Sequence, residues 1–138
     1  MLPRKNPSLF DLSFVRFLVV GLANTLIGLS IIYAGKWLIG WNDVVANMVG
    51  YSLGLILSFI LNKRWSFRYI GSHGPAMFRF VLVIAVAYTL NLCMTLATIS
   101  IFDVNSYLAQ ALGVAPYTII TYLGSRYYVF PNQKIGVV

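Results

Sequence analysis

Residues 44–62 read VVANMVGYSLGLILSFILN, a run without a single charge, and Lys63 and Arg64 follow it directly. At about 1.5 Å per residue, an α-helix of this length reaches about 28 Å, close to the roughly 30 Å of a bilayer's hydrocarbon core. Backbone polar groups inside lipid must be hydrogen-bonded within their own element, so the run is expected to be helical. It predicts a membrane-spanning helix that ends at a basic pair.

Three further uncharged runs of similar length occupy 17–35, 80–102 and 104–125. The connections between the runs are short, so consecutive runs are expected to pair as two antiparallel helical hairpins. We therefore predict an all-α membrane protein with four transmembrane helices. The first run is longer than the roughly 7–15 apolar residues of a signal peptide and no cleavage pattern follows it, so it is expected to stay in the mature protein.

The composition excludes an ordinary soluble domain. Hydrophobic residues make up 59% of the chain and charged residues only 9%, against roughly 25% charged residues in a typical soluble domain. A net charge of +7 would indicate nucleic-acid binding in a polar protein. Here the basic residues lie at the ends of apolar runs, which indicates membrane interfaces and argues against a nucleic-acid partner.

The basic residues also predict the orientation, because cytoplasmic connections of membrane proteins carry an excess of Lys and Arg. Nine positive charges lie in or beside the N-terminal arm, the central connection and the C-terminal tail. The opposite side holds only Lys36, with Asp43 and Asp103. Both termini are thus predicted to be cytoplasmic, in a multi-pass protein of the cell (inner) membrane. The nine residues are Arg4, Lys5, Arg16, Lys63, Arg64, Arg68, Arg79, Arg126 and Lys134.

The two predicted hairpins align with each other. Residues 14–67 align with 77–130 without a gap, and we call this pairing the repeat alignment. We predict a single transmembrane domain, 1–138, built from two parallel hairpins related by an axis along the membrane normal. The alternative is that any two amphipathic membrane hairpins align loosely. The identical landmarks are Arg16-Phe17 with Arg79-Phe80, Asn42 with Asn105, Ala46 with Ala109, Gly50 with Gly113 and Phe67 with Phe130.

Amide side chains interrupt the apolar runs. Each lies in a stripe of polar and small residues at steps of three and four, which places the stripe on one helix face. Glycines and hydroxyl residues in such stripes often serve helix packing. An amide without a partner is costly in lipid, so the amides are candidate substrate-binding groups along a polar path. They are Asn24, Asn62, Asn91 and Gln110.

No Asp, Glu, Lys, Arg or His lies inside any of the four runs. A proton-coupled exporter normally carries an intramembrane carboxylate as its proton site, so we expect facilitated movement down a gradient. The single histidine, His73, is expected in the central turn, and no second metal ligand lies near it in the sequence. Nothing resembles a catalytic set. We expect a protein that is not an enzyme and uses neither a metal nor another cofactor.

Basic residues border the runs on the predicted cytoplasmic side, and they have two interpretations. They can anchor the protein to anionic lipid head groups. They can also bind a phosphate of the substrate, because guanidinium groups hold phosphate oxygens by bidentate hydrogen bonds. The residues concerned are Arg16, Lys63, Arg64, Arg79 and Arg126.

Residues 58–67 read SFILNKRWSF, which strongly resembles the sFllNrrwtF signature of the GtrA-like family of small four-span membrane proteins. RFLVVGLANT at 16–25 looks like that family's first-span pattern, and Arg79-Phe80 resembles its third-span start. RYYVF at 126–130 is similar to a decayed copy of the signature. The resemblance covers about 14–130. Ser125 and Tyr127 depart from it, because they stand where the repeat would place a second Asn and a second basic residue.

The resemblance implies a flippase that moves a polyprenyl-phosphate-linked monosaccharide, such as undecaprenyl-phosphate glucose, from the cytoplasmic to the outer leaflet. The sugar then serves O-antigen or cell-wall glycosylation, and a membrane glycosyltransferase is the implied partner. Four helices are few to surround a sugar, so a homo-oligomer or a complex with that enzyme is expected. The alternative is a non-transporting accessory subunit that recruits or stabilises the glycosyltransferase. A small drug or metabolite exporter is a third reading, which the absent intramembrane carboxylate disfavours.

Overall fold

The structure is a computed structural model that describes residues 11–131, and every regular element in that part of the chain is helical. The prediction of an all-helical protein is therefore confirmed. Three short π-helical turns, labelled η, extend α-helices at their C-terminal ends. In chain order the elements are α1 (Leu12–Ala34), η1 (Gly35–Ile39), α2 (Asp43–Leu61), η2 (Asn62–Ser66), α3 (His73–Phe102), α4 (Ser106–Gly124) and η3 (Ser125–Val129).

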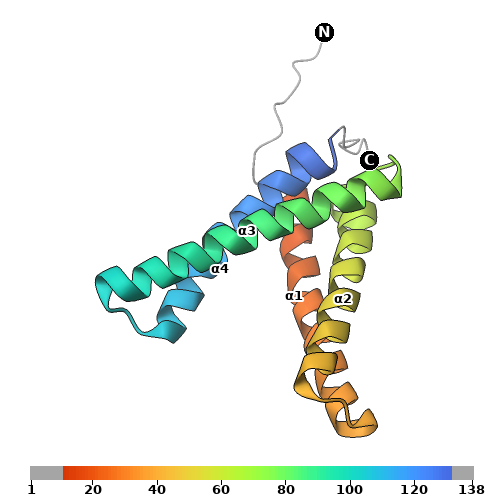
Figure 1. The fold of residues 1–138 in the computed structure, drawn as a ribbon. Coiled ribbons are helices and arrows are strands. Elements are labelled where there is room, and N and C mark those ends of the chain that lie inside the picture. Colours follow the sequence, from red (N-terminus) through yellow and green to blue (C-terminus); the bar gives the residue numbers. More distant parts are fainter. Residues whose placement is uncertain (1–10, 132–138) are drawn as a thin grey trace. The chain divides into compact units, whose positions relative to one another are not determined.

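The helices form two compact units, one ending at Arg68 and the other beginning at Tyr69. In the first unit α1 packs along α2, and in the second α3 packs along α4 (Figure 1). Each unit is thus a helical hairpin. We call them hairpin one and hairpin two. The repeat alignment pairs the first residue of α2 with the first residue of α4, and likewise their last residues.

The turns within the two hairpins are built alike. Gly40 and Asp103 adopt the left-handed conformation, with φ of 79° and 51°, and each ends the helical segment before the turn. Asn42 and Asn105 then cap α2 and α4. Their Oδ1 atoms accept hydrogen bonds from backbone amides of the first helical turn at 2.9 and 2.8 Å. Such caps satisfy amides that have no partner at a helix start.

The connection between the hairpins is shorter than the sequence indicates. The expectation that His73 lies in a turn is wrong, because His73 is the first residue of α3. Ser72 before it is extended and precedes the helix as its cap residue. Pro75 is accommodated in the first turn, where the missing amide hydrogen of proline is not needed for helix bonding.

Three helical segments are long and apolar enough to cross a membrane: Leu12–Ile39, Asp43–Ser66 and His73–Phe102. Many of their large apolar side chains are exposed, as lipid-facing residues are. Helix α4 is not among the three; it contains Gln110 and Pro116. The molecule is thus a helical membrane protein with several spans, and α4 as the fourth span stays a prediction.

The orientation of the chain in the membrane also stays a prediction. Part of its basis, Arg4, Lys5 and Lys134, lies outside the described residues.

Candidate functional site

We call the end of hairpin one that carries Arg16, Lys63 and Arg64 its basic end, and the end of hairpin two that carries Arg79 and Arg126 its basic end. At the basic end of hairpin one, Arg16 of α1 contacts the end of the second helix. Its guanidinium lies 5.8 Å from the centre of the Trp65 ring, and Nη1 donates to the Trp65 carbonyl oxygen at 3.4 Å. The last carbonyl groups of a helix have no intrahelical partner, and a cation there also interacts favourably with the helix dipole. The aromatic rings of Phe17 and Phe67 pack beside this contact, 6.1 Å apart. Arg16 therefore ties the start of α1 to the end of α2.

Hairpin two repeats the arrangement at its own basic end. The Arg79 guanidinium of α3 lies 6.0 Å from the Tyr128 ring, and Nη2 donates to the Val129 carbonyl oxygen at 3.4 Å. In the repeat alignment, Arg79 and Tyr128 are the counterparts of Arg16 and Trp65. The Nε atom of Arg79 is buried without a hydrogen-bond partner. One donor of this arginine is thus left over after the hairpin contacts are made.

The turn η2 is held together by Asn62, which is 2% exposed. Its Oδ1 accepts from the Ser66 hydroxyl at 2.8 Å, and its Nδ2 donates to Ser58 Oγ at 3.2 Å. Its backbone carbonyl accepts from the Phe67 amide at 2.9 Å, the wide spacing of a π-helix. Asn62 was predicted to bind substrate; the structure shows its amide engaged within its own hairpin.

Ser125 occupies the equivalent position in η3, where its carbonyl oxygen accepts from the Phe130 amide at 2.8 Å. The side-chain network of Asn62 is missing here. Thr121 donates to a backbone carbonyl instead, and Val129 carries no hydroxyl. The buried Oγ of Ser125 has no hydrogen-bond partner. The two π-turns therefore share a backbone geometry and differ in polar chemistry.

The remaining predicted basic residues divide into buried and exposed ones. Lys63 and Arg126, at equivalent positions in η2 and η3, are only 3% and 6% exposed. Arg126 donates from Nη1 to the Tyr122 hydroxyl at 2.6 Å and lies 5.7 Å from the Tyr127 ring. Arg64 is exposed and makes no hydrogen bond or ion pair with residues 11–131. The five basic residues thus differ in their surroundings, and Arg64 is the exposed one among them.

The predicted amides also differ in their surroundings. Asn24 of α1 and Asn91 of α3 are half-buried, and their Oδ1 atoms are enclosed without a hydrogen-bond partner. Gln110 is exposed near the start of α4 and donates to Ser106 Oγ at 3.2 Å. The structure brings Asn24 against Gly54 and Asn91 against Gly113. Two of the predicted amides therefore face the second helix of their own hairpin, and Gln110 does not share that environment.

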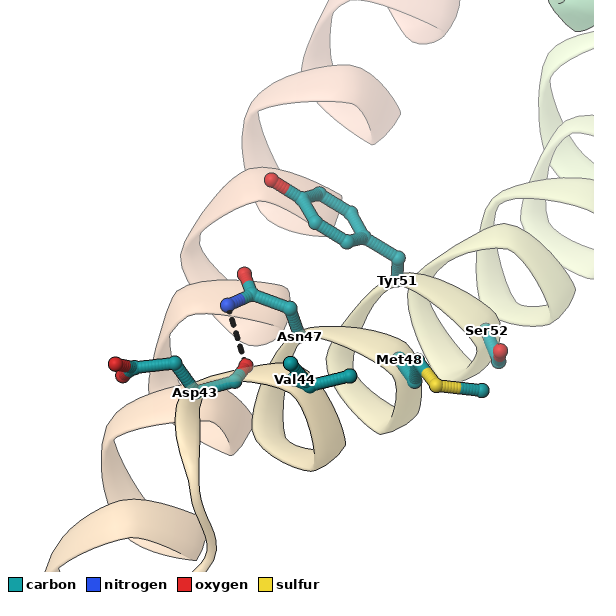
Figure 2. Close-up of a pocket in the computed structure, with 6 residues that line it drawn as sticks. All are labelled: Asp43, Val44, Asn47, Met48, Tyr51 and Ser52. Atoms are coloured by element: carbon teal, nitrogen blue, oxygen red, sulfur yellow. Dashed lines mark hydrogen bonds between the residues drawn. The ribbon is translucent and has the colours of Figure 1, made fainter.

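A shallow hollow lies on the surface of α2 (Figure 2). In it, Asn47 Nδ2 donates to the Asp43 carbonyl oxygen at 2.7 Å, and the Asp43 carboxylate pairs with Lys36 of η1. All lining residues belong to one helix, so the hollow is a surface depression. It contains none of the predicted substrate-binding residues. Its lining is Asp43, Val44, Asn47, Met48, Tyr51 and Ser52.

Sequence reasoning did not single out Trp65 and Tyr128 as partners of the arginines. The signal that could have found them is the repeat alignment, because it pairs one aromatic residue with the other and also pairs Arg16 with Arg79. Within residues 11–131, no group of three metal-ligating side chains occurs.

Comparison with known protein families adds one match. The family described as "GtrA/DPMS, transmembrane domain" matches residues 16–130, which covers both hairpins from Arg16 to Phe130. Among curated proteins, no sequence matches the chain.

Proposed function

The chain belongs to the GtrA/DPMS transmembrane-domain family, and on that premise we propose that it is a flippase for a polyprenyl-phosphate-linked monosaccharide. Undecaprenyl-phosphate glucose is the representative substrate. The protein moves it from the cytoplasmic to the outer leaflet of the cell (inner) membrane, for O-antigen or cell-wall glycosylation. The family supports lipid-linked sugar translocation as the function class; the sugar and the pathway are part of the proposal.

The observation that supports the proposal is the exposure of the Arg64 side chain. It follows the buried pair Asn62 and Lys63 in η2, yet its own side chain is exposed and makes no hydrogen bond within the described residues. A guanidinium fork matches the oxygen atoms of a phosphate and can donate two parallel hydrogen bonds. Arg64 captures the substrate phosphate at the basic end of hairpin one, while the prenyl chain stays in lipid.

The other predicted residues act within their own hairpins. Arg16 and Arg79 hold the basic ends of the two hairpins, and Lys63 and Arg126 add positive charge there. Polar groups within the helices replace the hydrogen bonds that the sugar makes to water, which lowers the free energy of the sugar inside the membrane. No residue inside the four uncharged runs carries a carboxylate, so movement follows the concentration gradient of the lipid-linked sugar.

The second candidate is a non-transporting accessory subunit of a membrane glycosyltransferase. The hollow in Figure 2 is lined by one helix alone, so it is a surface depression and not a cavity for a sugar. A flippase of this size needs further helices around the sugar, and a second copy of the chain supplies them. Both candidates therefore include a partner in the membrane.

A reconstitution experiment separates the two candidates. The purified full chain is placed in vesicles with labelled undecaprenyl-phosphate glucose in both leaflets, without any glycosyltransferase. A membrane-impermeant reagent then modifies the sugar from outside. A flippase makes nearly all of the label reactive, whereas an accessory subunit leaves the inner-leaflet half protected, as in vesicles without protein.

A further inference from the structure

In each hairpin an asparagine of the first helix faces a glycine of the second. A methyl group built on Gly54 would lie 3.1 Å from Asn24 Oδ1, and one built on Gly113 would overlap Asn91 Oδ1. Both oxygen atoms are buried, and neither accepts a hydrogen bond. The Nδ2 atoms of Asn24 and Asn91 donate no hydrogen bond within residues 11–131 either. Each glycine therefore leaves room for an amide that nothing in its own hairpin engages.

The two amides occupy different positions in the repeat. In the repeat alignment, Asn24 pairs with Ala87, and Asn91 pairs with Gly28. Counted from the arginine at the basic end of the same hairpin, Asn24 lies eight positions along α1 and Asn91 twelve positions along α3. At about 1.5 Å per residue these separations are about 12 and 18 Å. Within its own hairpin, Asn91 thus lies about one helical turn further from the arginine than Asn24 does.

Helix packing alone does not account for these amides. Close helix contacts in membranes use small residues, and Gly28 opposite Gly50 makes such a contact in hairpin one without an amide. A buried carbonyl oxygen without a donor destabilises a structure in lipid. The neighbouring glycine offers only a weak Cα–H donor in its place. Each amide therefore has a hydrogen-bonding capacity that its own hairpin does not use.

We propose, on the basis of the proposed function, that Asn24 and Asn91, each within its own hairpin, bind a hydroxyl group of the sugar. Gly54 and Gly113 are the positioning residues that let these amides lie between the helices. A sugar hydroxyl both donates and accepts, which matches the amide group. Thr95, one turn after Asn91 and close to the same face of Gly113, adds a hydroxyl beside Asn91. The two amides recognise the sugar and not the lipid phosphate.

The test uses the full chain in vesicles and two ligands: undecaprenyl-phosphate glucose, and undecaprenyl phosphate without a sugar. In Gly113→Ala the new methyl group displaces the flexible end of Asn91. We expect the affinity for the sugar lipid to fall about fivefold, the effect of one neutral hydrogen bond, and the affinity for the bare lipid to stay unchanged. Gly21→Ala is the matched control, because no atom lies within 4 Å of its added methyl group.

A double variant separates positioning from packing. Asn91→Ala in the Gly113→Ala background removes the overlap, so thermal stability returns to the wild-type value while the affinity for the sugar lipid stays low. Recovery of that affinity in the double variant, or an equal loss for both ligands in Gly113→Ala, overturns the inference. If the wild-type chain binds neither ligand, the proposed function itself is overturned, and the inference with it.

Discussion

The guanidinium of Arg16 lies over the ring of Trp65 and donates to the carbonyl oxygen of the same residue. One side chain thus contacts both the aromatic face and the backbone at the end of the facing helix. Arg79 and Tyr128, their counterparts in hairpin two, repeat the ring contact. The same ring contact thus recurs in both hairpins, whereas Arg64 makes no hydrogen bond or ion pair within residues 11–131.

The contact of Arg16 with Trp65 is expected to stabilise hairpin one. A partly exposed cation–π pair contributes about 0.5–1 kcal/mol, so Trp65→Leu should lower the free energy of unfolding by about that amount. Thermal denaturation in detergent measures the effect. Trp37→Leu is the control, because Trp37 is 91% exposed. Equal stability of the two variants would show that the Arg16 contact contributes nothing.

Asn62 and Ser125 occupy equivalent positions and should respond differently to alanine. Asn62→Ala leaves the hydroxyl groups of Ser58 and Ser66 without their amide partner, and we expect a loss of about 1–3 kcal/mol in the free energy of unfolding. The Ser125 hydroxyl has no partner to lose, so Ser125→Ala should be neutral or slightly stabilising. Unfolding in denaturant measures both. A Ser125→Ala loss as large as that of Asn62→Ala contradicts the described network.

The helices and their order could be predicted from the sequence because charge-free runs of membrane length have one stable form in lipid. The connection at 103–105 was also predicted correctly, since α3 ends at Phe102 and α4 begins at Ser106. The start of α3 was predicted wrongly because His73 and Gly74 with Pro75 read as a turn, whereas proline is also tolerated in a first helical turn.

The candidate site was predictable only in part. The sequence identifies which residues are polar or basic. It does not reveal whether an arginine side chain contacts a ligand or a backbone carbonyl. Arg16 and Arg64 both border a span, and only their contacts distinguish them. The buried network of Asn62 depends on the π-turn, in which the carbonyl at 62 bonds the amide at 67. No periodicity in the sequence indicates that turn.

The predicted orientation places the central connection and the C-terminus in the cytoplasm. Reporter fusions at Gly71 and Val138 should therefore be active in the cytoplasm, and a fusion at Gly40 should report the opposite side. The reason is the excess of basic residues on one side. An external signal from the fusion at Gly71 would contradict this orientation.

Transport should not depend on a proton gradient, because no Asp, Glu, Lys, Arg or His lies inside the four uncharged runs. Vesicles that contain the protein and labelled undecaprenyl-phosphate glucose should show the same initial rate with and without a proton-conducting uncoupler. Both rates are measured in vesicles across which a proton gradient has been imposed, so that the uncoupler has a gradient to dissipate. A rate that collapses with the gradient requires a titratable site that the account does not contain.

The most direct test of the central claim is the initial rate of undecaprenyl-phosphate glucose translocation in vesicles with wild-type protein, Arg64→Lys or Arg68→Lys. A charge-assisted hydrogen bond contributes about 1.5–3 kcal/mol, roughly ten- to a hundredfold in affinity. Lysine keeps the charge and loses the planar fork. The account predicts rapid translocation by wild type and Arg68→Lys, and translocation at least tenfold slower at subsaturating substrate by Arg64→Lys. Equal rates for all three proteins would contradict phosphate capture by Arg64, and a wild-type rate equal to that of protein-free vesicles would contradict the flippase itself.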